Sequence, residues 1–248
     1  PREYTNIAGI KLKLFMVRDN SLTMGAPRSQ KGQRANEFEK KIRLTKPFYA
    51  GVFEITNRQF AAFDPKKGSG PANMPVTSVS WQEAAAFCNW LSAGEKIGPF
   101  YRIQQGKVTG FDPGAEGYRL LSEGEWEWLA RKSGKAEQTL FTWGDARVIP
   151  PKTANVADES ARGQVKFFVP NYKDGFANAA PVGSFDREPS GLYDMAGNVS
   201  EWVHDVYSIL PPKGETLAEN PLGEQQGVSH VVKGANWRSG TITTLRPA

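Results

Sequence analysis

The chain has 248 residues, of which 39% are hydrophobic, 11% aromatic and 23% charged, so it can bury a sizeable core and is not intrinsically disordered. Its net charge of +5 is modest, and basic residues alternate with apolar ones, which argues against a nucleic-acid-binding protein. The single cysteine, Cys88, excludes an intrachain disulfide and a cysteine-rich zinc site, and no apolar run is long enough for a transmembrane segment.

Short strands are predicted in the first third of the chain. Apolar and polar residues alternate over residues 9–15 and 41–44, and residues 48–53 are predicted to form the next strand. Residues 24–36 carry turn-forming and charged residues without periodicity. This segment is therefore predicted to be a surface loop.

Two helices are predicted from their N-terminal caps. Ser80 with Glu83 forms a capping box, and the helix that follows is expected to run to about residue 91. Ser122 with Glu125 forms a second capping box, before a helix that ends near residue 134. Cys88 lies in an apolar run of the first helix, and we expect it in the core.

Beyond residue 141 the chain loses its helical periodicity and is interrupted by turns. Long ordered loops in a compact domain need something to hold them, and a bound cation is the remaining candidate once disulfides are excluded. Asp194 and Glu201 lie seven residues apart around a glycine turn, and oxygen ligands of this kind suit Ca²⁺. Taken alone, the two carboxylates are more often turn caps than metal ligands.

Several segments spread over almost the whole chain carry further motifs. They are MG at 24–25, FEITN at 53–57, PVTSVSW at 75–81 with CNWL at 88–91, YRLLSEGEWE at 118–127, PVGS at 181–184, GLYDMAGNVSEW at 191–202 and KGANWR at 233–238. Together, and in this order, they resemble the formylglycine-generating-enzyme family, also called the sulfatase-modifying-factor domain.

This resemblance implies an α+β fold with a C-type-lectin-like core, small antiparallel sheets, two main helices and much irregular chain. A single domain over residues 1–248 is expected. The final Gly-Phe-Arg strand that such domains usually carry is absent after Ala248, and the chain begins with Pro1. We therefore expect a domain that is clipped at the C-terminus and belongs to a longer precursor. A periplasmic or extracellular location is a separate expectation.

The resemblance also implies one or two structural calcium ions. The ligands of the first would be the side chains of Asp194 and Glu201 with the carbonyl groups of Gly197 and Val199. The ligands of the second would be the side chains of Asn155 and Asp174 with the carbonyl groups of Val156 and Phe176. The match is firmer for the first site, because the loop of the second is longer here and Asp158 could compete as a ligand.

The oxidase members of the family use two thiols near the C-terminus to bind copper, because a soft thiolate pair selects Cu(I). In this chain those positions fall on or near Ser239 and Thr244, which cannot form thiolates. Ser200 also stands where the family commonly has a tryptophan. Copper and formylglycine-generating chemistry are therefore not expected, although the question whether the chain is an enzyme stays open.

Two classes of function follow. The first is a non-catalytic, calcium-stabilised subunit of an envelope or secreted assembly, which binds a protein partner or peptide-like ligand around Trp237, Arg238 and Ser239. A lectin-like receptor with a variable C-terminal surface is a related possibility. The second is a cysteine-independent oxidase, such as the family members associated with siderophore-precursor maturation, and authentic formylglycine generation is the least favoured alternative.

Overall fold

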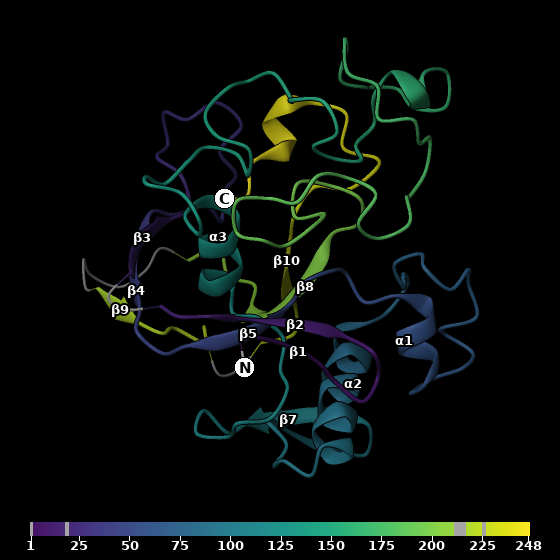
Figure 1. The fold of residues 1–248 in the computed structure, drawn as a ribbon. Coiled ribbons are helices and arrows are strands. Elements are labelled where there is room, and N and C mark those ends of the chain that lie inside the picture. The colour runs from purple at the N-terminus through teal and green to yellow at the C-terminus, as the bar shows by residue number, and fades with distance from the viewer. Residues whose placement is uncertain (1, 18–19, 211–216, 225–226) are drawn as a thin grey trace.

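The computed structural model describes residues 2–17, 20–210, 217–224 and 227–248. The chain forms short strands and few helices joined by long irregular segments, which confirms the predicted α+β class (Figure 1). In chain order the elements are β1 (Glu3–Thr5), β2 (Lys11–Phe15), β3 (Asn20–Met24), β4 (Lys40–Leu44), β5 (Phe48–Gly51), α1 (Asn57–Ala61), α2 (Trp81–Gly94), β6 (Tyr101–Gln104), β7 (Lys107–Phe111), α3 (Glu123–Arg131), the 3₁₀ helix η1 (Glu159–Ala161), β8 (Glu201–Val206), β9 (Ala218–Glu219), β10 (His230–Lys233) and the 3₁₀ helix η2 (Ile242–Leu245).

The strands form small sheets, of which β1-β2-β5 and β10-β8 lie near the middle of the molecule (Figure 1). One sheet has the order β1-β2-β5 and is antiparallel, with Leu12 opposite Gly51. A second has the order β10-β8, a third the order β3-β4-β9 with β9 parallel to β4, and β6 and β7 form a hairpin. Figure 1 shows α2 and β7 at one end, α3, β8 and β10 in the middle, and the loops of residues 150–200 at the other end.

Both predicted helices are present with the predicted caps. The Ser80 side chain accepts a hydrogen bond from the backbone of Glu83, and the Ser122 side chain accepts one from Glu125. The second helix ends at Arg131, a few residues earlier than predicted. The sequence analysis did not predict α1, although its cap at Thr56 forms a capping box of the same kind.

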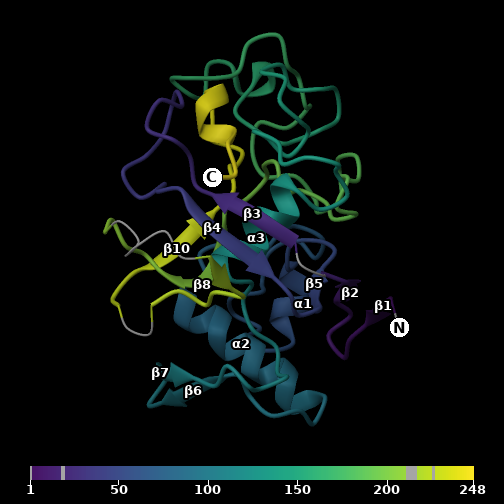
Figure 2. The ribbon, with the colours of Figure 1, turned by 90° about the vertical axis from the view of Figure 1, so that its left-hand side faces the viewer.

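The largest core cluster lies around α3, whose residues from Gly124 to Arg131 are all buried. Trp126 and Leu129 pack there against Ile42 of β4 and Val203 of β8. Because this helix also contains acidic and basic residues, its burial takes charged groups into the interior, where they need partners. Figure 2 shows α3 behind β3 and β4.

Other predictions about the chain can also be compared with the structure. Cys88 is buried in the core, as predicted, and burial raises the pKa of its thiol to about 12. Residues 25–39 contain no strand or α-helix, as the predicted surface loop requires. None of the helices in the described ranges is long and apolar enough to cross a membrane.

Candidate functional site

The loop before β8 has a tightly constrained backbone. Asp194 and Asn198 both have positive φ angles, of 66° and 67°. A Cβ atom on Gly197 would lie 2.2 Å from the carbonyl oxygen of Asn155, so only glycine fits there. The sequence thus folds residues 194–201 into a turn that presses against residue 155.

This turn places two predicted calcium ligands in the interior. Asp194 Oδ2 accepts a hydrogen bond of 2.6 Å from the Gly183 N–H, whereas Asp194 Oδ1 is buried without a hydrogen-bond partner. Glu201 Oε2 accepts a bond of 2.8 Å from Trp126 Nε1. Burial raises the pKa of Asp194 to about 6 and that of Glu201 to about 7, and the bond from Trp126 offsets only part of the effect on Glu201.

A third carboxylate, Glu54, comes to this loop from between β5 and α1. Its Oε2 accepts a bond of 2.6 Å from the Asn198 side chain, and its Oε1 accepts one of 3.0 Å from the Val199 N–H. Burial, and then the charges of Asp194 and Glu201, raise the pKa of Glu54 well above its usual range. We call Glu54, Asp194 and Glu201 the acidic cluster.

The acidic cluster has no ion pair with a lysine, arginine or histidine in the part of the chain that the structure describes. The nearby Glu188 is half-buried, and desolvation raises the pKa of its carboxyl to about 8, against the opposing charge of Lys135. Several carboxyl groups therefore lie close together here, and burial favours their protonated forms.

The second predicted site lies next to the first. Asp174 Oδ2 accepts a bond of 2.9 Å from the Val156 N–H, and its Oδ1 accepts one of 2.7 Å from the Phe176 N–H. Burial raises the pKa of Asp174 to about 6. The structure thus brings Asp174 close to Val156 and Phe176, three of the predicted ligand residues. Asp158 Oδ2 accepts a bond from the Asp174 N–H, so Asp158 lies beside this site as the sequence analysis anticipated.

Asn155 joins the two predicted sites. Its Nδ2 donates to the Asn178 carbonyl at 2.9 Å and to Asn198 Oδ1 at 3.0 Å, and its own carbonyl accepts from the Asn198 N–H at 2.8 Å. Asn155 Oδ1 is buried without a hydrogen-bond partner. Buried polar atoms normally have a hydrogen-bond partner, and an amide oxygen that has none is available as a ligand for a cation such as Ca²⁺.

These features fit calcium better than a transition metal. Each predicted site includes one buried oxygen without a partner, Asp194 Oδ1 in the first and Asn155 Oδ1 in the second. Among the described residues no group of three or more His, Cys, Asp or Glu side chains is arranged to hold a metal. A site here would therefore depend on carbonyl and amide oxygens as well as carboxylates, which is typical of Ca²⁺.

The predicted binding residues lie on a loop between β10 and η2. Trp237 is half-buried and Arg238 exposed, with the guanidinium 5.0 Å from the centre of the Trp237 ring. The Trp237 N–H donates to the Asn198 carbonyl at 2.9 Å, so this loop is attached directly to the turn of the acidic cluster.

The hydroxyl groups at the two expected thiol positions take part in local hydrogen bonds. Ser239 Oγ accepts from the Asn236 N–H at 3.1 Å, and Thr244 Oγ1 donates to the Thr241 carbonyl at 2.7 Å. Ser200, which stands at the expected tryptophan position, donates to the Gly234 carbonyl at 3.0 Å and accepts from the Asn236 side chain at 2.8 Å. All three hydroxyls therefore hold the loop in shape.

A second loop lies beside this one and carries similar side chains. A Cβ atom on Gly240 would lie 1.9 Å from the Phe167 carbonyl oxygen, so the two loops touch. Phe167 is 62% exposed, Lys166 lies 5.3 Å from its ring centre, and Arg162 lies 4.6 Å from that of Phe168. We call the exposed surface of residues 162–168 and 237–238 the aromatic-basic surface.

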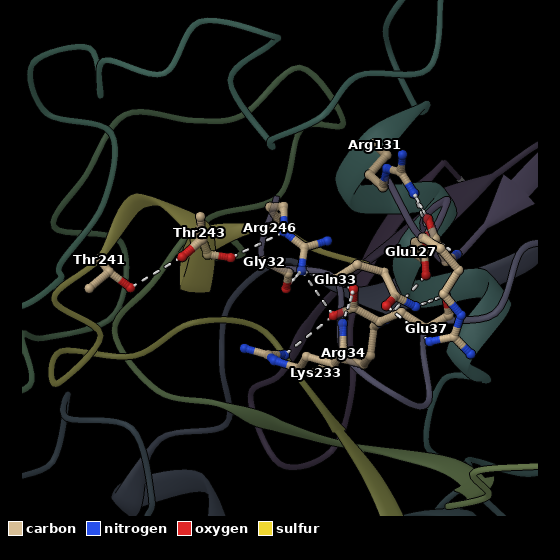
Figure 3. Close-up of polar contacts among 12 residues, drawn as sticks. Gly32, Gln33, Arg34, Glu37, Glu127, Arg131, Lys233, Thr241, Thr243 and Arg246 are labelled. Carbon is tan, nitrogen blue, oxygen red and sulfur yellow. Dashed lines mark hydrogen bonds and ion pairs between the residues drawn. The ribbon is translucent and has the colours of Figure 1, made fainter. Parts of the chain in front are cut away.

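The C-terminal segment is attached to the rest of the fold by buried polar contacts of Arg246. Arg246 Nη2 donates to both carboxylate oxygens of Glu37, at 3.2 and 2.9 Å, and to the Gly32 carbonyl (Figure 3). The side chains of Arg246 and Glu37 are each only 2% exposed. The segment after η2 is thus joined to the loop between β3 and β4 by a buried ion pair.

Further charged groups lie close to this pair. Lys233 of β10 donates to Glu127 of α3 at 3.1 Å, and Arg131 donates to the same carboxylate at 2.6 Å (Figure 3). Burial alone would lower the pKa of Lys233, but the charges of Glu127, Glu123 and Glu37 raise it. We call Glu37, Glu127, Arg131, Lys233 and Arg246 the buried ion cluster.

Neither histidine of the chain belongs to these groups. His204 is buried, its Nδ1 lies 3.1 Å from the Tyr101 hydroxyl, and burial lowers its pKa to about 4. His230 stacks on Trp81 with ring centres 3.4 Å apart. Both side chains pack against aromatic rings of the fold.

Sequence reasoning missed Glu54 and the buried ion cluster. Glu54 stands in the FEITN motif, which was used for the resemblance but not for any role of this residue. Its partner residues are 144 and 145 positions away in the chain. No local pattern indicates such a contact.

Comparison with known proteins assigns the chain to a family. A family model described as the sulfatase-modifying factor enzyme 1-like domain matches residues 13–248. The chain is 34% identical to the formylglycine-generating enzyme of Mus musculus over 167 residues, which are 67% of this chain and 36% of the mouse protein. It is 28% identical to the chaperone protein LppX of Paenibacillus barcinonensis over 198 residues, covering 72% of this chain and 69% of that protein.

Solved structures show the same fold. Treponema denticola variable protein 1 matches with a TM-score of 0.76 and 20% identity, covering 99% of this chain and 91% of that one. PvdO from Pseudomonas aeruginosa matches with a TM-score of 0.68 and 20% identity, covering 99% of this chain and 89% of that one. These similarities confirm the predicted fold.

Proposed function

Because the chain belongs to the family of sulfatase-modifying factor enzyme 1-like domains, we propose that it is a non-catalytic member, stabilised by calcium, that binds a partner as part of a larger assembly. Family membership is compatible with this role, since a fold can persist while its original site changes. The matched segment makes up 36% of the mouse enzyme, so the activity of that whole protein is not transferred to this chain.

One observation carries the proposal. The hydroxyls of Ser239 and Thr244 replace the two expected thiols and are engaged in hydrogen bonds with the backbone, as is Ser200 at the expected aromatic position. A hydroxyl needs an adjacent general base to become a nucleophile. Neither histidine supplies one, because His204 bonds to Tyr101 and His230 stacks on Trp81.

Calcium is proposed at one or both of the predicted sites. The unpartnered oxygens of Asp194 and Asn155, together with the unpaired carboxylates of the acidic cluster, support this part of the proposal. The ion would hold the loops of residues 155–176 and 194–201 together and neutralise buried negative charge. No copper is expected, since Cys88 is the only thiol and lies in the core.

Binding is proposed through the aromatic-basic surface. Tryptophan, phenylalanine and arginine contribute strongly to protein interfaces, because large rings bury much area and guanidinium groups form directed hydrogen bonds. Trp237 and Arg238 lie on this surface, with Ser239 fixing the loop beneath them. The partner is a protein or peptide-like ligand, and a periplasmic or extracellular location is part of the same proposal.

The test uses the full chain as bait. The double variant Trp237→Ala/Arg238→Ala should lose a partner that co-purifies with the wild type, while keeping its melting temperature. Lys107→Ala, on β7 at the opposite end of the molecule, is the matched control and should retain the partner. Equal recovery of the partner by both variants would show that binding occurs elsewhere.

A second assay addresses catalysis. A cysteine-containing peptide incubated with the protein, Cu(I) and oxygen should show no conversion to formylglycine by mass spectrometry. Oxygen consumption should also stay at the level of the buffer when small aromatic substrates are supplied. Turnover in the first assay would overturn the non-catalytic proposal, and turnover in the second would favour the cysteine-independent oxidase.

A further inference from the structure

The aromatic-basic surface carries more positive than negative charge. Arg162, Lys166 and Arg238 are all exposed there. Arg162 is paired with Glu159, whose Oε2 lies 2.6 Å from Arg162 Nη2. Lys166 and Arg238 form no ion pair within the described ranges. The surface therefore presents two cations that no carboxylate of the described residues pairs.

Both of these cations lie over aromatic rings. The Arg238 guanidinium is 5.0 Å from the centre of the Trp237 ring, and Lys166 Nζ is 5.3 Å from that of Phe167. A ring attracts a cation through its quadrupole but does not neutralise it. The charges thus stay available to an anion, while Phe167, which is 62% exposed, offers apolar contact beside them.

Backbone hydrogen bonds hold the two loops of this surface in place. The Ala157 N–H donates to the Ser239 carbonyl at 3.2 Å, and the Val169 N–H donates to the Ala157 carbonyl at 2.8 Å. The Trp237 N–H donates to the Asn198 carbonyl at 2.9 Å. A surface that is formed before binding loses less conformational entropy when a ligand arrives.

We propose that the aromatic-basic surface binds an acidic peptide segment, whose aspartate or glutamate side chains pair with Lys166 and Arg238 while the apolar side chains between them pack on Phe167 and Trp237. The inference rests on the binding role proposed above and names the chemistry of the partner. Hydrogen bonds between a carboxylate and a guanidinium or ammonium group are stronger than neutral ones, and the rings supply contact area.

A peptide fits this surface better than a nucleic acid or a sulfated polysaccharide. Proteins that hold a nucleic acid by charge make about six to ten phosphate contacts. Here Arg162 is already paired with Glu159, which leaves fewer cations than such a ligand requires. Bases also stack on open ring faces, whereas Trp237 is half-buried and has Arg238 over its ring.

The test measures binding of the blocked, fluorescently labelled peptide Ser-Asp-Leu-Glu-Phe-Asp-Leu-Glu-Ser to the full chain by anisotropy. A matched peptide with Asn and Gln in place of Asp and Glu keeps the shape and removes the charge. It should bind at least about tenfold more weakly, because its hydrogen bonds are no longer charged. Equal affinity for the two peptides, or no binding of the acidic peptide up to about 1 mM, would overturn the proposal.

A third peptide tests the apolar contacts. It has serine in place of leucine and phenylalanine and keeps every carboxylate. Its binding should also be weaker than that of the first peptide, because the rings of Phe167 and Trp237 lose the side chains that pack on them. Undiminished affinity would show that charge alone determines binding, contrary to the proposal.

Protein variants locate the contact. Lys166→Gln/Arg238→Gln removes both cations and keeps both rings, so the difference between the acidic and amide peptides should disappear in this variant. Arg102→Gln/Lys107→Gln removes the same number of charges from exposed positions on β6 and β7, and this matched control should bind as the wild type does. Equal losses of affinity in the two variants would reduce the effect to net charge and contradict the proposal.

Two other polyanions test the class of the partner. A short oligothymidylate and a short heparin fragment are titrated at the same ionic strength as the peptides, because exposed charges are screened by salt. Both should bind more weakly than the acidic peptide. Tighter binding of either one would overturn the assignment to a peptide.

The two proposals can fail separately. If the co-purifying partner is lost from Trp237→Ala/Arg238→Ala but kept by Lys166→Gln/Arg238→Gln, the surface binds its partner and the acidic class is wrong. If both variants keep the partner, the binding role of the surface is wrong and the inference falls with it. Loss from both, with retention by Arg102→Gln/Lys107→Gln, supports both proposals.

Discussion

In the buried ion cluster each carboxylate lies against a lysine or an arginine, whereas in the acidic cluster no ion pair forms among the described residues. Glu37 bonds to Arg246, and Glu127 bonds to both Arg131 and Lys233. Positive and negative charges are thus buried together. Glu54 and Asp194 are also buried and Glu201 is half-buried, but among the described residues these three accept hydrogen bonds from neutral donors.

The two clusters differ in how their buried charges are compensated. A buried pair is neutral as a unit, and removing one partner leaves an uncompensated charge. Buried carboxylates without a partner hold a proton or bind a cation instead, which is why the pKa of each member of the acidic cluster is raised. The charges of the first region are balanced within the chain, whereas the carboxyl groups of the second form no ion pair among the described residues.

The largest expected effect follows from breaking a pair in the buried ion cluster. Arg246→Met removes the guanidinium and leaves the carboxylate of Glu37 buried without a cation. We expect the free energy of unfolding to fall by about 3–5 kcal/mol, measured by urea denaturation. The exposed pair of Arg162 with Glu159 provides the control, and Arg162→Met should cost less than about 1 kcal/mol. Similar losses of unfolding free energy in the two variants would show that the buried pair contributes no more to stability than the exposed one.

Removal of calcium with a chelator tests the acidic cluster. If calcium neutralises the acidic cluster, its removal should lower the free energy of unfolding by about 3 kcal/mol when the ion was present at a hundred times its Kd. For a chain of this size the melting temperature should fall by roughly 5–10 °C in a thermal scan.

The control for chelation is a protein that lacks the ligands. Asp194→Asn/Glu201→Gln should melt at the same temperature with and without calcium. An unchanged melting temperature of demonstrably metal-free wild-type protein would remove calcium from the proposed function. The buried ion cluster should not respond to chelation in either case.

The pH dependence of stability should differ with and without calcium. The folded-state pKa of Asp194, about 6, and that of Glu201, about 7, exceed their ordinary values of 3.8 and 4.5. The folded, calcium-free protein therefore binds protons more tightly than the unfolded chain. Its stability is fully present near pH 4 and is lost as the pH rises through about 6 to 7.

In calcium-free protein, lowering the pH from 7 to 5 should stabilise the wild type by about 3 kcal/mol relative to Asp194→Asn/Glu201→Gln. With calcium bound the carboxylates are ionised, so the same acidification should weaken ion binding and destabilise the protein. Denaturant titrations at several pH values distinguish the two trends. Parallel curves for wild type and variant would show that these two carboxyls do not titrate in the folded state as stated.

The smallest expected effect concerns Ser200, which attaches the acidic loop to the loop of residues 234–239. Ser200→Ala removes the bonds to the Gly234 carbonyl and the Asn236 side chain. We expect a loss of about 1 kcal/mol in unfolding free energy, because each group retains access to other partners. The response to chelation should not change, and a larger loss that appears only in calcium would show that the two loops are coupled through the ion.

Much of the local structure could be predicted from the sequence. The capping boxes at Ser80 and Ser122 act over three residues, so local spacing is enough to place the starts of α2 and α3. The alternation over residues 41–44 likewise predicted β4. α1 was missed because its capping box at Thr56 begins a helix of only five residues, too short for an apolar period to be visible.

The candidate calcium loops could be named by resemblance, and the structure brings Val156 close to Asp174 and Asn155 close to Asn198. Calcium binding at these loops stays a prediction. Glu54 could not be assigned a role in advance, because its bonds to Asn198 and Val199 cross more than half the chain.

The sequence by itself determined the family, the two main helices and the absence of a thiol at Ser239 and Thr244, because each of these depends on residue identity or on spacing within a few positions. Only the tertiary structure decided which buried charges are paired. Arg246 bonds to Glu37 across 209 positions, whereas the hydrogen bond that Glu201 accepts within the described ranges comes from the indole of Trp126. The free energy of a buried charge depends on what surrounds it in space, and that surrounding is assembled by the fold from distant parts of the chain.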